Sequence, residues 1–191
     1  ISFILCTLAA TAQCPMQNTA FSAGETLDYT LHFNWGLIWL KVGTAKMTVR
    51  DTMYHSTPAY TCDLITRTGG KAEKFFRMRD TLRSVVTHDI VPIYYRKGAN
   101  EGGQYRVDEV WYSYPGNCTQ MKQRYRNAKG KVTTRENTSI ECVYDMVSML
   151  LRARSFDGSQ YKKGDRINFL MADGDEVEPQ TLVFRGKKEF K

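Results

Sequence analysis

The sequence lacks long hydrophobic runs, and no stretch reaches the roughly 18 apolar residues that a membrane-spanning helix needs. Glycine and proline are unremarkable, at 14 and 5 of 191 residues, which excludes a collagen-like or low-complexity chain. Aromatic residues are plentiful, and 9 Phe, 11 Tyr and 3 Trp offer enough apolar surface for burial to exclude intrinsic disorder. The composition therefore predicts one globular domain with a formal charge of +7.

Catalytic and metal-binding motifs are absent as well. The histidines stand alone in the sequence, and it contains neither a Gly-x-Ser-x-Gly turn nor a phosphate-binding loop. Asp108 and Glu109 are neighbours on a predicted strand and point to opposite faces, so they cannot act as an acid–base pair. We therefore expect no enzyme activity, no metal and no other cofactor. If a catalytic cluster exists, Asp28, Thr30 and His32 on one strand face are the residues to inspect first.

The N-terminal segment indicates export. Residues 1–12 are uncharged and apolar and end in Ala-Thr-Ala, which is typical of the end of a secretory signal peptide. Cleavage after Ala12 predicts a periplasmic or secreted protein. A lipid anchor at Cys14 is an alternative, but Gln13 is larger than the small residue that usually precedes an acylated cysteine. A buried N-terminal strand is the other alternative.

Most of the chain alternates apolar and polar residues with period two, the pattern of half-buried strands. The predicted strands cover residues 25–34, 39–51, 60–68, 75–87, 93–97, 104–114, 120–127, 131–137, 166–173 and 177–185. Residues 142–155 instead have the spacing of an amphipathic helix. We therefore predict a mainly β fold: a large antiparallel curved sheet or half-barrel, with one helix plugging its end or lying across its concave face.

The cysteines allow one pairing to be predicted. After signal cleavage, Cys14, Cys62, Cys118 and Cys142 remain, and their spacing resembles no metal site. A hairpin about residues 128–130 places Cys118 opposite Ile140, so that one bulge would bring Cys142 within reach. This register predicts a Cys118–Cys142 disulfide, with free buried thiols as the alternative.

Two groups of side chains are candidates for binding. Trp35, Trp39, Tyr95 and Trp111 are aromatic candidates for an apolar or amphiphilic ligand, the first two at a predicted hairpin tip. The two Trp residues at this tip could instead cap the core. A basic stripe on the 120–137 hairpin is the candidate for anions, and consists of Lys122, Arg124, Arg126 and, on the partner strand, Arg135. The alternative for the stripe is a solvated face that prevents aggregation.

Scattered motifs resemble a known family. Residues 21–29, with the pattern F-x-x-G-E-x-L-x-Y, and residues 35–45, with G-x-x-x-x-x-V-G-x-A, resemble the first hairpin of the bacterial domain of unknown function 3108. Residues 144–148 and 184–189 resemble its helix entry and a later strand. The resemblance implies an exported, mostly β protein of Gram-negative, Bacteroides-like bacteria, without established activity. It also implies a single domain over residues 21–191 that continues past Lys191.

These observations predict an exported cell-envelope protein that binds a lipid-like or other amphiphilic ligand inside a curved sheet, with peripheral membrane contact an option. The alternative is a structural or assembly protein that docks envelope polysaccharide or another envelope protein. Export argues against nucleic acid as a partner. A hollow apolar interior would favour the first function, and a packed interior would favour the second.

Overall fold

An eight-stranded antiparallel sheet forms the body of the protein in the computed structural model, which describes residues 14–35 and 38–187, with only the backbone described at positions 34, 35, 38 and 39. The predicted signal peptide, residues 1–12, lies outside the described residues. The sheet consists of β1 (Thr26–Trp35), β2 (Ile38–Tyr54), β3 (Thr57–Thr68), β4 (Met78–Thr87), β5 (Pro92–Glu101), β6 (Gln104–Ser113), β7 (Thr119–Arg126) and β8 (Val132–Ser139).

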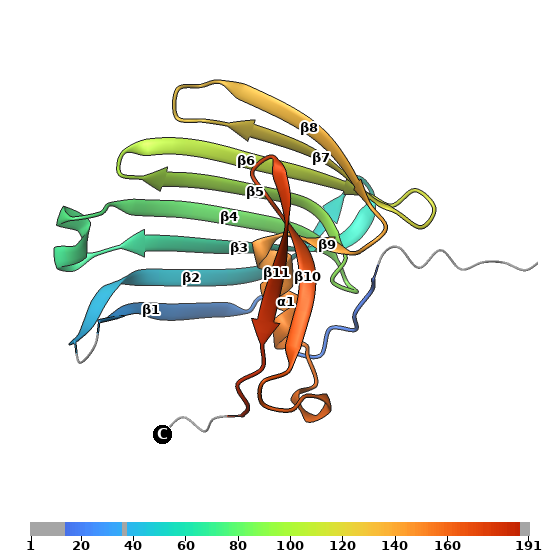
Figure 1. Ribbon diagram of the computed structural model, residues 1–191, viewed down its shortest axis with the longest axis horizontal. Coiled ribbons are helices and arrows are strands. Elements are labelled where there is room, and N and C mark those ends of the chain that lie inside the picture. Colours follow the sequence, from blue (N-terminus) through green and yellow to red (C-terminus); the bar gives the residue numbers. More distant parts are fainter. Residues whose placement is uncertain (1–13, 36–37, 188–191) are drawn as a thin grey trace, which may run out of the picture.

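Each strand of this sheet pairs with the next one along the chain, so β1 and β8 form its two edges and the sheet does not close. Figure 1 shows the curved open sheet, and the prediction of a mainly β half-barrel is confirmed. Gly43 lies at the irregularity between β1 and β2, where the backbone of Arg67 leaves no room for a Cβ atom. A 3-10 helix, η1 (Gly70–Lys74), lies between β3 and β4.

A smaller layer crosses one face of the sheet. It contains β9 (Val143–Tyr144), α1 (Met146–Arg154), η2 (Gly158–Gln160), β10 (Arg166–Asp173) and β11 (Glu176–Val183). The β10–β11 hairpin crosses the long strands and α1 lies beside it (Figure 1), with contacts from α1 to β3 and β4. The helix begins at Met146, later than the predicted start at residue 142, because Val143 and Tyr144 pair in parallel with β10 instead. Among the described residues, no helix is long and apolar enough to cross a bilayer.

The core lies between the sheet and this layer. Cross-strand partners Cys62, Ser84, Tyr95 and Val110 point to the same side and are all buried. They belong to one cluster with the helix residues Val147 and Leu151, except for the polar Ser84. We call this side of the sheet the covered face and the opposite side the open face. Side chains fill the covered face. Of the two interiors considered from the sequence, hollow or packed, this cluster is therefore packed.

The predicted disulfide is wrong, although the register behind it is correct. Arg126 pairs with Val132 and Thr119 with Ser139, as the hairpin predicted. Cys142, however, forms a disulfide with Cys14, and the Cα atoms are 6.1 Å apart, whereas Cys118 is free. After β8 the chain turns away from β7 to enter β9, so Cys142 meets the N-terminal segment instead.

Candidate binding surface on the open face

The open face of the sheet is strongly basic. The strand registers place on it Lys46, Arg50, Arg67, Arg79, Arg83, Arg96, Lys122, Arg124 and Arg126. The acidic side chains on the same face of the described strands are Asp28, Asp63, Glu109 and Glu136. Because positive charge exceeds negative charge across neighbouring strands, this face favours anions.

Asp63 organises the centre of this face. It is only 6% exposed and accepts hydrogen bonds from Arg83 Nε at 2.6 Å and Arg50 Nη2 at 2.5 Å. Burial by itself would raise the pKa of Asp63, but the two guanidinium groups outweigh burial and hold the pKa below its ordinary value. The carboxylate thereby fixes both arginines in place while leaving about half of each side chain exposed.

An arginine-lined recess lies beside Asp63 and its two arginines, since Arg96 of the recess pairs with Arg83 in the strand register. It has a volume of about 200 Å³ and is lined by Arg96, Val107, Glu109, Arg124 and Arg126. Arg124 Nη1 contacts Glu109 Oε2 at 3.3 Å, whereas no carboxylate among the described residues pairs with Arg96 or Arg126. Three guanidinium groups around one carboxylate leave donors free for a carboxylate, sulfate or phosphate of a ligand.

Tyr105 and Gly98 set the positions of those arginines. Arg96 Nη2 donates to the Tyr105 hydroxyl at 3.2 Å, and the Arg126 guanidinium lies 5.8 Å from the centre of the Tyr105 ring. A Cβ atom at Gly98 would lie 2.8 Å from the Tyr105 hydroxyl, so only glycine leaves that side chain in place.

An aromatic strip borders the basic surface. Tyr54 stacks on Tyr94 with ring centres 6.1 Å apart, and Tyr94 packs on Trp111 at 5.5 Å. The Tyr94 hydroxyl donates to Glu109 Oε1 at 2.8 Å, which joins the strip to the arginine recess. Burial and this carboxylate raise the pKa of Tyr94, so the hydroxyl stays protonated. Half-exposed aromatic rings beside arginines are typical of sites that combine stacking with ionic contacts.

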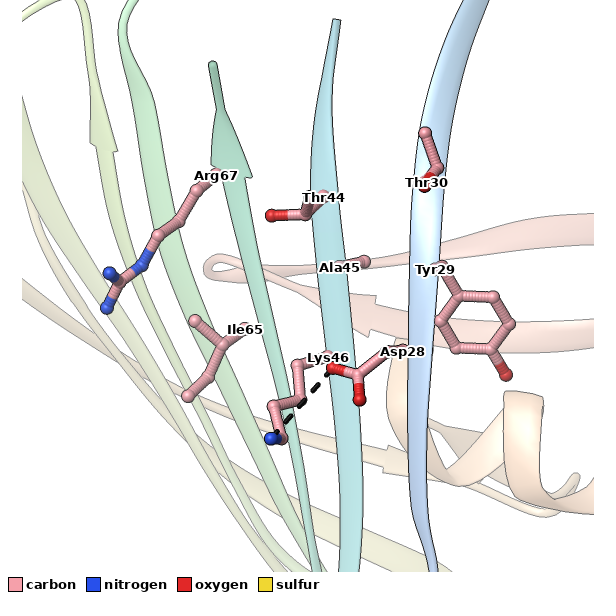
Figure 2. Close-up of a pocket in the computed structure, with 8 residues that line it drawn as sticks. All are labelled: Asp28, Tyr29, Thr30, Thr44, Ala45, Lys46, Ile65 and Arg67. Atoms are coloured by element: carbon pink, nitrogen blue, oxygen red, sulfur yellow. Dashed lines mark ion pairs between the residues drawn. The ribbon is translucent and has the colours of Figure 1, made fainter. Parts of the chain in front are cut away.

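A larger recess, of about 460 Å³, opens near the β1 edge of the sheet. Figure 2 shows its open-face side chains: Asp28 and Lys46 approach each other across β1 and β2 at 3.9 Å, and Ile65 and Arg67 project beside them from β3. Thr30 and Thr44 add hydroxyl groups to the same recess. Of the polar cluster suggested by the sequence, Asp28 and Thr30 line this recess and His32 does not. The basic surface therefore extends from the β1 edge to β7.

The predicted aromatic ligand site does not form as a unit. Tyr95 is 1% exposed within the covered core, whereas Trp111 lies on the open face opposite Tyr94. The side chains of Trp35 and Trp39 lie outside the described residues. The prediction grouped aromatic residues by type, but neighbouring strand positions alternate between faces, so Tyr95 and Trp111 cannot share a ligand.

The predicted basic stripe is correct for its first strand and wrong for Arg135. Lys122, Arg124 and Arg126 share the open face. Arg135 pairs with Gln123 and therefore points to the covered face, where its Nε contacts Asp175 Oδ2 at 3.1 Å. Arg135 thus fastens the tip of the β10–β11 hairpin to the sheet.

The fold and this surface define a mainly β half-barrel protein with one face packed and the other basic. The chain belongs to the family described as "Protein of unknown function (DUF3108)", whose model matches residues 28–191. Searches among curated proteins and among solved structures found no match.

Proposed function

We propose that this protein is an exported, non-enzymatic binding protein of the cell envelope that docks an acidic polysaccharide on the open face of its sheet. The observation that carries the proposal is the excess of arginines on that face, three of them around the 200 Å³ recess. Guanidinium groups bind carboxylates and sulfates in a bidentate manner, and the adjacent Tyr94–Trp111 pair offers a surface for sugar rings.

The compartment supports a saccharide over a nucleic acid. The Cys14–Cys142 disulfide is favoured outside the reducing cytosol, in agreement with the predicted signal peptide. The anionic ligands that an exported protein meets are acidic polysaccharides and membrane lipids, and basic side chains on the open face of several successive strands suit a linear polymer. The packed covered face supports a docking protein over an internal carrier.

The first prediction concerns the arginine recess. The triple variant Arg96→Gln, Arg124→Gln, Arg126→Gln is expected to bind polygalacturonate about ten- to a hundredfold more weakly than the wild type, since it loses three exposed ionic contacts of up to about 1 kcal/mol each. In a plot of the logarithm of affinity against the logarithm of salt concentration, the magnitude of the slope should fall by about one for each arginine removed. Isothermal titration at several salt concentrations measures both quantities, with uncharged dextran as the ligand control.

A matched variant separates this site from net charge. Lys162→Gln, Lys163→Gln, Arg166→Gln removes the same charge from exposed positions around the start of β10 and should keep wild-type affinity. An equal loss of affinity in both variants would show a general charge effect and contradict the assigned site.

The second prediction uses the acidic residue within the recess. Glu109→Gln removes the carboxylate that contacts Arg124 and is expected to strengthen polygalacturonate binding several-fold, because it releases a guanidinium for the ligand. The same titration checks this outcome. Weaker binding by Glu109→Gln would mean that Glu109 contacts the ligand itself or orders the arginines, and would contradict its role as a competitor.

A second candidate function, binding of an amphiphile, is favoured by one apolar recess of about 200 Å³ between α1 and the β10–β11 hairpin. Met146, Met149, Leu150, Phe169 and Met171 contribute to its lining, and Met146 and Leu150 are exposed on the helix. Flexible methionines can adapt to an acyl chain. Displacement of a fluorescent fatty acid, compared between the wild type and Leu150→Glu, tests this function.

A further inference from the structure

Two adjacent phenylalanines stand out from one end of the sheet. Among the described residues, Phe75 is the most exposed large hydrophobic side chain, at 91%, and its neighbour Phe76 is 51% exposed. Both follow η1 in the connection from β3 to β4. Apolar surface is unfavourable in water, so two neighbouring exposed rings indicate a surface that another body covers.

A second apolar pair lies at the same end of the sheet. Phe33 and Leu40 are cross-strand partners on β1 and β2, and are 56% and 44% exposed. Both lie beyond Gly43, which pairs with Thr68 at the end of β3, and η1 begins just after Thr68 and contacts β2. Figure 1 shows the end of β1, the start of β2 and η1 at one end of the sheet. We call this group of side chains the apolar tip: Phe33, Leu40, Phe75 and Phe76.

Backbone hydrogen bonds fix the turn that presents the phenylalanines. The Gly69 N–H group donates to the Val42 carbonyl at 3.0 Å, which ties the start of the connection to β2. The N–H groups of Phe75 and Phe76 both donate to the Ala72 carbonyl, at 3.0 and 2.9 Å. The exposure of the two rings is therefore a property of a hydrogen-bonded turn.

Free positive charge lies beside the rings. Glu73 is the one acidic residue of the sequence between β3 and β4, and it pairs with Arg79 and, at 3.9 Å, with Arg77. Lys71 and Lys74 are exposed, and no carboxylate among the described residues pairs with either of them. Exposed aromatic rings flanked by lysines complement a bilayer, which is apolar inside and carries anionic headgroups at its surface.

We propose that the apolar tip docks the protein on a lipid bilayer, with the Phe75 and Phe76 rings in the interfacial region. Lys71 and Lys74 then contact the phosphates of anionic phospholipids. The rings protrude, so a fluid surface that closes around them fits better than a small ligand that fills a cavity. This inference goes beyond the proposed polysaccharide function, because no residue of the apolar tip lines the arginine recess.

Flotation of the full chain with vesicles of phosphatidylcholine and phosphatidylglycerol tests the proposal. The variant Phe75→Ser, Phe76→Ser should lower the partition coefficient at least about tenfold, because it removes two large apolar side chains from the contact. The variant Lys71→Gln, Lys74→Gln should lower it about tenfold at low salt. At high salt the effect of the phenylalanines should persist and that of the lysines should vanish, since only the ionic contacts are screened.

Matched variants control for loss of apolar surface and of charge elsewhere. Met53→Ser, Ile140→Ser removes two side chains that are 64% and 85% exposed at the opposite end of the sheet, and should bind vesicles as the wild type does. Lys162→Gln, Lys163→Gln removes the same charge from other exposed positions and should also keep wild-type binding. Equal losses in a tip variant and its matched control would overturn the assignment of the site.

Fluorescence tests insertion directly. Phe75→Trp should gain emission that lipids brominated on their acyl chains quench, compared with the wild type, whereas the emission added by Met53→Trp should not be quenched. The absence of wild-type binding to the vesicles, undiminished binding by Phe75→Ser, Phe76→Ser, or equal quenching of the two tryptophan variants would each overturn the proposal. A Phe75→Ser, Phe76→Ser variant that does not fold would also overturn it, because the rings would then belong to the packed protein.

Discussion

Replacement of Cys142 by serine is expected to lower the free energy of unfolding by about 5 kcal/mol, from the chain entropy of the unfolded state. The Cys14–Cys142 disulfide closes a loop with a sequence separation of 128, so it restricts most of the unfolded chain. It also anchors an N-terminal segment that contacts α1, where Arg152 Nη1 donates to the Cys14 carbonyl at 2.7 Å. Denaturant unfolding of the oxidised wild type and of the variant measures the difference.

The free cysteine provides the control for this result. Cys118→Ser should change the free energy of unfolding by no more than about 0.5 kcal/mol, because Cys118 is half-buried and forms no disulfide. Reduction of the wild type should reproduce the Cys142→Ser result and leave the stability of Cys142→Ser unchanged. Equally large effects of Cys118→Ser and Cys142→Ser, with none of Cys14→Ser, would restore the pairing that the sequence suggested and contradict the structure.

The large sheet could be predicted because its information is local. Period-two alternation located the strands, and the turn at Asn127–Lys131 set the β7–β8 register from Thr119 to Arg126. Asn127 holds that turn by accepting hydrogen bonds from the backbone N–H groups of Lys129 and Lys131, both at 3.0 Å. Consecutive strands then pair in order, so one correct hairpin predicts its neighbours.

The long-range contacts could not be predicted in the same way. The disulfide joins residues 128 positions apart in the sequence, and β9 consists of two residues that become a strand only because β10 lies beside them. The docked hairpin tip depends on Gln123, whose Nε2 donates to the Glu176 carbonyl at 2.9 Å. No local pattern reports such contacts, because they depend on how the second layer packs on the sheet.

The candidate surface was predictable only in part. Alternation along β7 correctly placed Lys122, Arg124 and Arg126 on one face, and the same alternation applied to β8 would have placed Arg135 on the other. Arg96 joins the recess through the order β5–β6–β7, which brings residues about thirty positions apart in the sequence onto two strands that flank β6. The sequence identifies Asp108 only as the neighbour of Glu109, and only the packed structure shows that its buried Oδ1 atom lacks a hydrogen-bond partner among the described residues.

The other large effect is expected at Asp145, which begins α1 inside the core. Its Oδ1 accepts hydrogen bonds from the backbone N–H groups of Val147 and Ser148 at 2.9 and 2.8 Å, and its Oδ2 accepts one from Ser84 Oγ at 3.0 Å. Asp145→Ala should be less stable than Asp145→Asn by about 2–4 kcal/mol, because both remove the charge but only asparagine keeps the helix cap and a partner for Ser84. Denaturant unfolding at one pH compares the two variants.

Asp145→Asn should also change how stability depends on pH. Burial raises the pKa of Asp145 from 3.8 to about 6, so its stabilising contribution is complete below pH 3.8 and is lost as the pH rises through 6. The wild type should therefore lose about 1 kcal/mol more than Asp145→Asn between pH 5 and pH 7.5. Asp108, whose pKa is also raised to about 6 by burial, contributes equally to both proteins and cancels in this comparison. Equal losses of stability in the wild type and Asp145→Asn over that pH range would mean that Asp145 has an ordinary pKa in the folded protein. Equal stability of Asp145→Ala and Asp145→Asn would mean that the cap does not hold α1 on the sheet.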